Sequence, residues 1–247
     1  MKSNYSKIKK IILKVIPKNI LFHYEYSLRY FYYLLYLGNK FQCNICHKKI
    51  SNFIPFGNDR LCPRCGSLQR TRRLMQILND GFINENTKIL HFSPSRSIYR
   101  VLKSKQNYLS SDLSGDFLCD VKYDITDIEA QKNSFDLIIC YHILEHIVDD
   151  QKAMNELLRV LKNGGFCIIQ TPFKAGKIYE DFSIKTSKER EKHFGQDDHV
   201  RIYSVSGLQK RLEDAGFEVE IKNFELDREN LHGFSSQETV LICNKPN

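Results

Sequence analysis

Short apolar runs alternate with helix-patterned stretches from residue 88 to the C-terminus, and this alternation constrains the fold more than any other feature. One intervening stretch, residues 149–161, carries a leucine stripe and is followed by Gly164 and Gly165, which are placed to end a helix. Repeated units of this kind build a mainly parallel sheet, so the expected fold class is α/β. The predicted strands cover residues 88–92, 108–111, 135–140, 166–171, 217–221 and 239–243.

The ends of the predicted strands carry the polar residues that a ligand would meet. In an open parallel sheet the ligand lies at the carboxyl ends of the strands, where the strand order reverses. Asp112 ends the second predicted strand, and a carboxylate there can accept hydrogen bonds from both hydroxyls of a ribose. A helix cap explains one such Asp equally well. The other residues at these ends are the segment 91–95, Asp120 and Asp124 around a short third strand, Tyr141, His142, Thr171 and Pro172.

Four cysteines form two C-x-x-C pairs. Cys43 and Cys46 are the first pair and Cys62 and Cys65 the second, with 15 residues between the pairs. Two such turns supply four thiolates in the tetrahedral arrangement that Zn²⁺ prefers, and a closed site of four thiolates leaves no position for a substrate. We therefore predict one structural Zn²⁺ that holds together a segment too small to own a hydrophobic core.

Other uses of these cysteines fit less well. Residues 43–47 match a haem attachment motif, but that chemistry needs export and leaves the second pair unexplained. Disulfides are rare in the cytoplasm, and neither pair opens a helix after a strand as redox dithiols do. Arginines around the second pair could bind phosphate groups or form a solvated helix face. These are Arg60, Arg64, Arg70, Arg72 and Arg73.

The N-terminal end of the chain is basic and amphipathic. Residues 1–80 carry 15 basic and 3 acidic side chains, a net charge of +12, whereas the whole chain carries +8. Residues 8–16 place Ile and Val on one helical face and Lys on the other, and residues 20–37 form a second predicted helix that Gly38 would end. These helices either pack on the body of the protein or bind an anionic membrane surface through residues 5–37.

The chain is expected to divide into three parts. These are a basic helical segment (1–40), a zinc ribbon with a connecting helix (41–80) and one larger domain (81–247). No stretch reaches the 18 or so apolar residues of a spanning helix, and no small-residue cleavage site follows the basic N-terminus. The expected location is the cytoplasm, with peripheral contact at the inner face of the membrane.

The segment from residue 135 to 172, FDLIICYHILEHIVDDQKAMNELLRVLKNGGFCIIQTP, resembles the fourth strand, following helix and fifth strand of class I S-adenosylmethionine-dependent methyltransferases. The resemblance extends over residues 88–243 and implies a Rossmann-like sheet that binds S-adenosylmethionine. It implies that Asp112 binds the ribose and that Asp124 with Ile125 lies near the adenine. The other residues that it brings to the cofactor are His91, Phe92, Ser93, Pro94 and Tyr141.

The first loop departs from the family's pattern. The family has an acidic residue and several glycines there, which let the backbone approach the cofactor, whereas this chain has His91, Ser93, Ser95 and Ser97. A binding module without catalytic turnover is therefore kept as an alternative.

Methyl transfer to a hydroxyl group needs close positioning and a base within hydrogen-bond reach. His142, just past the fourth strand, is the predicted base, while Glu145 and His146 either support it or pack as a structural pair. The polar stretch 174–199 is predicted to cover the strand ends as a lid, and its end supplies two further catalytic candidates, His199 and Arg201.

The cysteine pairs, the segment LHFSP and the segment HFGQDDHVRIY resemble, more narrowly, a bacterial subgroup associated with surface-polysaccharide assembly. The leading prediction is an O-methyltransferase acting on a sugar or lipid-linked glycan precursor. RNA methylation, with the ribbon on the phosphate backbone, is one alternative, and an interaction protein is another. Nucleic acid fits less well, because RNA does not call for a helix with an isoleucine face.

Overall fold

A computed structural model of the chain describes residues 18–225 and 229–247. The chain forms two compact units, and each is assembled from segments that are separate in the sequence. The N-terminal unit comprises Met1–Gly81, Ser95–Leu102 and Glu225–Gln237, and the sheet unit comprises Phe82–Pro94, Lys103–Phe224 and Glu238–Asn247. The N-terminal unit therefore includes two segments from the part of the chain expected to form the larger domain.

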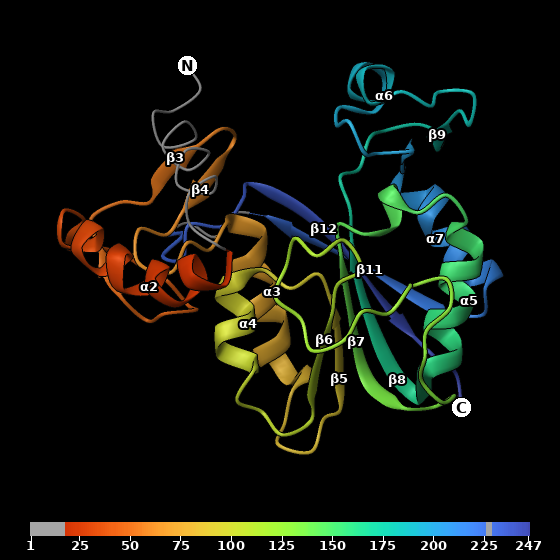
Figure 1. Ribbon diagram of the computed structural model, residues 1–247, viewed down its shortest axis with the longest axis horizontal. Helices are drawn as coiled ribbons and strands as arrows, with labels where there is room; N and C mark the ends of the chain where they lie inside the picture. Colours follow the sequence, from red (N-terminus) through yellow and green to blue (C-terminus); the bar gives the residue numbers. More distant parts are fainter. Residues whose placement is uncertain (1–17, 226–228) are drawn as a thin grey trace. The chain divides into compact units, whose positions relative to one another are not determined.

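Among the described residues, the N-terminal unit contains two short antiparallel pairs and the α-helices α2, α3 and α4 (Figure 1). Helix α2 ends at Leu34, three residues before the predicted end, and Gly38 lies inside a strand. A Cβ at Gly38 would lie 2.8 Å from Ser51, so the glycine permits close approach of two strands and does not end the helix. The predicted helix 8–16 lies outside the described residues. The elements are α2 (Lys18–Leu34), β1 (Leu37–Gln42), β2 (Lys49–Ile50), β3 (Ile54–Phe56), β4 (Asp59–Leu61), α3 (Gln69–Ile77) and α4 (Arg96–Leu102).

A six-stranded sheet forms the centre of the sheet unit, in the order β11-β12-β8-β7-β5-β6. Strands β6, β5, β7 and β8 run parallel, and β12 runs antiparallel to β8. All six predicted strands are present, and the α/β class is confirmed. The strands are β5 (Ile89–Phe92), β6 (Tyr108–Ser111), β7 (Phe135–Tyr141), β8 (Leu161–Gln170), β11 (Glu218–Glu225) and β12 (Gln237–Asn244).

Helices α5 (Asp150–Val160) and α7 (Val205–Asp214) lie on one side of this sheet (Figure 1). Met154 and Leu157 of α5 and Leu208 of α7 are buried in the cluster that also contains the inward residues of β5, β7, β8 and β12. The apolar faces of both helices are thus buried against the sheet, and this burial holds the two helices on it.

Two sequence expectations in this unit were wrong. The predicted third strand between Asp120 and Asp124 is reduced to one bridge, Ser111 to Val121. Helix α5 passes into β8 at Leu161 without a glycine stop, and Gly164, with φ of 71°, lies within the strand.

The predicted lid is an ordered segment. It contains β9 (Tyr179–Glu180), helix α6 (Ser187–Phe194) and β10 (Arg201–Ile202), and the two strands pair antiparallel. Thr186 and Glu189 form a capping box at the start of α6, which explains why a polar sequence becomes helical there. Across the described residues, no helix is both long and apolar enough to cross a membrane.

Candidate functional site in the sheet unit

The strand order reverses at β5, which pairs with β6 on one side and β7 on the other. Ser93, Asp112 and His142 follow the carboxyl ends of β5, β6 and β7, respectively. This reversal is where ligands bind in open α/β sheets, so the three residues mark the candidate site.

Ser93 makes the sharp turn that follows β5. Its φ of 45° lies in the left-handed region, which glycine normally occupies. Its backbone N–H donates to the carbonyl of Ser111 at 2.7 Å, and its hydroxyl donates to Oδ1 of Asp112 at 2.8 Å. These bonds hold a non-glycine residue in a strained conformation, as is common at functional sites. Pro94 follows it and is buried.

Asp112 is 2% exposed, and its carboxylate is held by donors from the protein. Besides the bond from Ser93, Oδ2 accepts from the Ser114 hydroxyl at 2.9 Å and from the Phe117 backbone N–H at 3.3 Å. These partners lie in a turn, so the helix-cap interpretation does not apply. Two hydroxyl groups, those of Ser93 and Ser114, already donate hydrogen bonds to this carboxylate. A ribose presents donors of the same kind.

Asp124 and Ile125 lie in a turn after the bridge at Val121. Oδ1 of exposed Asp124 accepts from the backbone N–H and the hydroxyl of Thr126, each at 2.8 Å. Ile125 is 4% exposed and belongs to the main core. The structure thus gives Asp124 a local turn and Ile125 a packing role, and it places Tyr141 half-buried at the end of β7.

His91 and Phe92, which the sequence suggested as cofactor ligands, are enclosed in β5. The ring of His91 is 2% exposed, and its Nδ1 lies 3.1 Å from the Tyr108 hydroxyl. Burial lowers the pKa of His91 to about 3, so the imidazole is neutral. Phe92 packs in the main core. The structure gives both side chains packing roles within β5, and their assignment to the cofactor stays a prediction.

His142 and Glu145 form a pair after β7. Nδ1 of His142 lies 3.2 Å from Oε1 of Glu145, while Nε2 of His142 is buried and makes no hydrogen bond. The φ of His142 is 56°, a second strained backbone position beside the strand reversal. Burial alone would raise the pKa of Glu145, but the neighbouring His142 lowers it below its ordinary value. A carboxylate on Nδ1 leaves Nε2 as the nitrogen that can accept a proton.

The end of the lid packs against the short 3₁₀ turn Leu144–His146. The backbone N–H of Val200 donates to the carbonyl of Glu145 at 2.9 Å. The ring centroids of His146 and His199 are 4.7 Å apart, and Nδ1 of His146 lies 3.2 Å from Oδ2 of Asp198. Burial, followed by the nearby His146, lowers the pKa of His199. The structure therefore brings the predicted residues His142 and His199 to the two sides of Glu145.

Arg201 holds this turn in place. Its side chain is 1% exposed, and Nη1 donates to the carbonyls of Leu144 and Ile147 while Nη2 donates to that of Val148. Its Nε donates to Glu180 at 2.9 Å. Because this buried guanidinium bonds to Glu180 and to three backbone carbonyls, the structure gives Arg201 a structural role in place of the predicted catalytic one.

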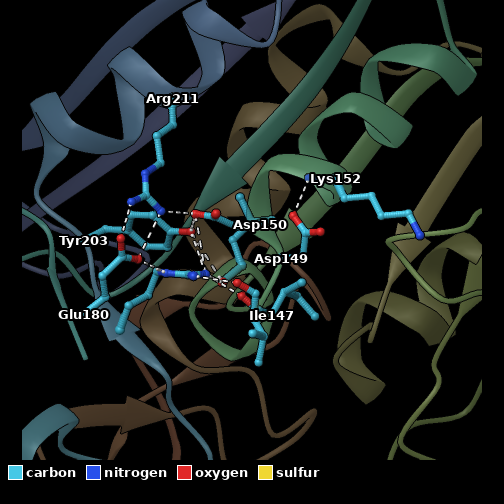
Figure 2. Close-up of polar contacts among 10 residues, drawn as sticks. Ile147, Asp149, Asp150, Lys152, Glu180, Tyr203 and Arg211 are labelled. Carbon is cyan, nitrogen blue, oxygen red and sulfur yellow. Dashed lines mark hydrogen bonds and ion pairs between the residues drawn. The ribbon is translucent and has the colours of Figure 1, made fainter. Parts of the chain in front are cut away.

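Figure 2 shows Asp150, Glu180, Tyr203 and Arg211 pointing toward one another. Arg201 bonds to Glu180 and to the Tyr203 hydroxyl of this network. Nη1 of Arg211 donates to Asp150 at 2.6 Å, and Nη2 donates to Glu180 at 2.5 Å. Burial raises the pKa of Glu180, but the hydrogen bonds from Arg211 and Arg201 outweigh it and lower the pKa overall. The network ties the lid strands to the N-terminus of α5.

The four predicted zinc ligands of the N-terminal unit converge. The Sγ atoms of Cys43 and Cys65 are 3.7 Å apart, those of Cys46 and Cys62 are 3.8 Å apart, and all four lie within 4.8 Å of one another. A tetrahedral Zn²⁺ with Zn–S bonds of about 2.3 Å sets its sulfurs about 3.8 Å apart. The arrangement is compatible with a zinc ribbon.

The arginines near the ribbon are mostly used inside the fold. Arg72 is fully buried and donates to the carbonyls of Arg60, Ser67, His232 and Gly233. Arg73, 4% exposed, stacks over the ring of Phe234. Arg64, 9% exposed, donates to the Tyr26 carbonyl and stacks over the same residue's ring, while Arg70 pairs with Asp59. Arg64, Arg72 and Arg73 are therefore used in the packing of the unit and do not form a phosphate-binding face.

A family model described as a methyltransferase domain matches residues 88–221, more than half of the chain. The chain belongs to the S-adenosylmethionine-dependent methyltransferases. A possible histamine N-methyltransferase of Thermotoga maritima has the same fold, with a TM-score of 0.50 and 17% identity, over 69% of this methyltransferase and 86% of that chain. The family resemblance of the segment 135–172 is thereby confirmed.

Two curated relatives match shorter segments of the methyltransferase. A probable S-adenosylmethionine-dependent methyltransferase of Mycolicibacterium smegmatis is 28% identical over 102 residues, 41% of this chain and 36% of its own length. An uncharacterised protein of Methanocaldococcus jannaschii is 36% identical over 87 residues, 34% of this chain and 38% of its own. The match therefore spans less than two fifths of either relative.

Sequence reasoning missed the network of the methyltransferase around Arg201 and the contact of Asp198 with His146. Asp150, Glu180 and Arg211 are far apart in the sequence and look like ordinary surface charges on helices and loops. The high density of charged residues at 193–201 was the one sequence signal for these contacts. It does not show which of the charged side chains are buried and which are exposed.

Proposed function

We propose that this methyltransferase transfers the methyl group of S-adenosylmethionine to a hydroxyl group of a sugar or lipid-linked glycan precursor. The observation that carries the proposal is the pair His142 and Glu145 at the carboxyl end of β7, with 3.2 Å between Nδ1 and Oε1. A sugar hydroxyl is a weak nucleophile at neutral pH, and a positioned base contributes about 10² to 10⁴ in rate.

The chain's own residues supply the proton transfer. S-adenosylmethionine brings an electrophilic methyl group on a sulfonium centre. The hydroxyl oxygen bonds to the methyl carbon, the carbon–sulfur bond breaks with its electron pair going to sulfur, and the hydroxyl proton passes to Nε2 of His142. Glu145 faces Nδ1, so its negative charge stabilises the imidazolium that forms.

Asp112, which follows β6, fits the ribose of the cofactor. Hydroxyls of Ser93 and Ser114 now bind this carboxylate, and their replacement by two ribose hydroxyls keeps the number of hydrogen bonds. Because the incoming donors match the outgoing ones, the exchange leaves no buried carboxylate oxygen without a donor.

We assign a structural Zn²⁺ to Cys43, Cys46, Cys62 and Cys65, because their sulfur spacing matches a tetrahedral site. Arg64, Arg72 and Arg73 are buried, so three of the five arginines near the ribbon are not available to a phosphate backbone. This observation disfavours RNA as the acceptor.

An exposed apolar stripe on α2 supports contact with a membrane surface. Ile20, Tyr24, Leu28 and Phe31 recur at helical spacing and are 49%, 57%, 61% and 69% exposed. Residues 1–40 carry 8 basic and 1 acidic side chains, which complements anionic headgroups. In this proposal the protein acts at the inner face of the membrane. Phe31→Ser should reduce sedimentation with anionic phosphatidylglycerol vesicles, whereas Leu231→Ser, also exposed, should not.

The test is incubation of the protein with methyl-labelled cofactor and cell extract, followed by separation of membrane-lipid, soluble-glycan and RNA fractions. Label in the lipid or glycan fraction supports the proposal, and label in RNA alone contradicts it. An absence of cofactor binding in calorimetry at millimolar concentration would favour the alternative of an interaction protein.

The role of His142 is tested separately. His142→Gln should lower kcat by about 10² or more with little change in the Kd of the cofactor, because the base acts only in the chemical step. His193→Gln is the matched control, since His193 lies in α6 and bonds to Tyr179. Equal kcat values for the two variants would remove His142 from the mechanism.

A further inference from the structure

A second cluster of metal-type ligands lies beside the candidate base. Glu145, His146 and His199 each offer one ligand atom, and these atoms lie within 4.8 Å of one another. The three residues come from the turn after β7 and from the end of the lid, which the Val200 to Glu145 backbone bond joins at 2.9 Å. The backbone therefore holds the two segments that carry these three side chains next to each other.

Two of the three residues, Glu145 and His199, carry buried polar atoms without a hydrogen-bond partner. Glu145 is 1% exposed; its Oε1 lies 3.2 Å from Nδ1 of His142, and its Oε2 is buried without a hydrogen-bond partner. Nε2 of His199 is also buried without a hydrogen-bond partner. Buried carboxylates and imidazoles are almost always bonded, so these atoms indicate an additional ligand.

The surroundings of His146 are those of a metal-bound histidine. Its Nδ1 lies 3.2 Å from Oδ2 of Asp198. A carboxylate on one imidazole nitrogen fixes the tautomer and leaves the other nitrogen for a metal. Asp198 thus acts as the outer partner, while Glu145, His146 and His199 are the direct ligands.

We propose that Glu145, His146 and His199 bind a divalent transition-metal ion at the acceptor side of the active site. Two imidazoles with one carboxylate suit Zn²⁺, Mn²⁺, Fe²⁺ or Co²⁺, whereas Mg²⁺ and Ca²⁺ prefer oxygen ligands alone. Three protein ligands leave open positions, in contrast to the closed four-cysteine site.

The role of this ion rests on the proposed function. An acceptor hydroxyl that binds at an open position would lose its proton more easily, because a bound metal ion lowers the pKa of a coordinated oxygen. His142 lies next to Glu145 and would receive that proton. The binding of the ion itself requires neither cofactor nor acceptor.

The test is titration with Co²⁺ of protein that carries one equivalent of Zn²⁺, enough to fill the four-cysteine site alone, followed by visible absorption. Co²⁺ bound by nitrogen and oxygen ligands gives only weak visible bands, whereas exchange into the four-cysteine site would add intense near-ultraviolet thiolate bands. The expected result is one equivalent of bound Co²⁺ with the weak bands alone. The absence of these bands, or the appearance of thiolate bands only, overturns the proposal.

Variants then assign the ligands. His199→Ala and His146→Ala should abolish the weak bands, and Asp198→Asn should weaken Co²⁺ binding by about 10-fold to 100-fold. His193→Ala and Asp197→Asn are matched controls that should bind as the wild type does. Because His199 is buried, the fold of the His199→Ala variant is compared with that of the wild type by circular dichroism. If His199→Ala is unfolded, the His146→Ala variant decides the assignment, because His146 is half-exposed. Retained bands in both histidine variants overturn the assignment.

The two proposals can fail separately. Co²⁺ binding without methyl transfer to any fraction would keep the metal site and remove the proposed function. Methyl transfer that is unchanged by selective removal of the second ion, with the zinc of the ribbon retained, would remove the catalytic role of the ion while leaving the methyltransferase activity.

Discussion

His91 makes the stability of the protein depend on pH in a way that can be calculated. Its pKa is lowered to about 3 by burial, and the pKa of an unfolded histidine is about 6.5. Below pH 6.5 the unfolded chain takes up a proton that the folded chain does not, so the folded state loses stability as the pH falls from about 6.5 toward about 3. Above pH 6.5 the contribution of His91 to stability is fully present. One pH unit corresponds to about 1.4 kcal/mol, so the loss at pH 5 is about 2 kcal/mol.

The variant His91→Gln isolates this effect. Glutamine does not titrate and can still bond to the Tyr108 hydroxyl, which lies 3.1 Å from His91. Urea unfolding of both proteins at pH 7.5 and pH 5.0 gives the four free energies of unfolding that are needed. The wild type should lose about 2 kcal/mol more than the variant, because all other titrating groups cancel in the comparison.

Equal losses in the two proteins would refute the reasoning, because they would mean that His91 is protonated in the folded state or exchanges readily with solvent. The same variant should leave the Kd of S-adenosylmethionine unchanged, since His91 is 2% exposed and packed against Tyr108. A large change in that Kd would support the assignment of His91 to the cofactor site.

Three further predictions follow from buried charges and ligands. Arg201→Met should lower the free energy of unfolding by about 3–5 kcal/mol in urea titrations, because it leaves Asp150 and Glu180 short of a partner, whereas Lys210→Met, at an exposed pair, should cost less than about 1 kcal/mol. Cys62→Ser should reduce the zinc content measured by atomic absorption, and Cys119→Ser should not; equal zinc in both would contradict the four-cysteine site. Asp112→Asn should weaken S-adenosylmethionine binding in calorimetry by about 10-fold to 100-fold, as expected for charged hydrogen bonds, while Asp127→Asn leaves the Kd unchanged. An unaltered Kd for Asp112→Asn would remove it from the cofactor site.

The sheet could be predicted because its signal is local and repeated. The central strands β5 and β7 are apolar except for His91 and Asp136, which reflects burial on both faces of a parallel sheet. Asp112 and His142 could be found for the same reason, since a residue that follows a recognised strand must lie at the sheet's carboxyl edge. The cysteine pairs were recognisable from their spacing alone.

The remaining features depend on contacts between distant residues. Gly38 looks like a helix stop, and only its approach to Ser51 shows why a strand needs it there. Arg201 lies in a charged stretch and resembles a substrate ligand until its carbonyl partners at residues 144–148 are seen. His91 sits beside the correct loop, but the fold turns its side chain toward Tyr108. Sequence patterns predict the secondary-structure element in which a residue lies, but they do not predict which distant residues its side chain contacts.

Residues 229–236, which precede β12, pack within the N-terminal unit. Within that unit the Gln42 backbone N–H donates to Leu231, and Arg72 donates to the carbonyls of His232 and Gly233. The stretch around residues 229–237 therefore supports the ribbon, although it is encoded some 160 positions later. A homologue that lost its cysteines would gain nothing from keeping this insertion, so the two regions should be inherited or discarded together.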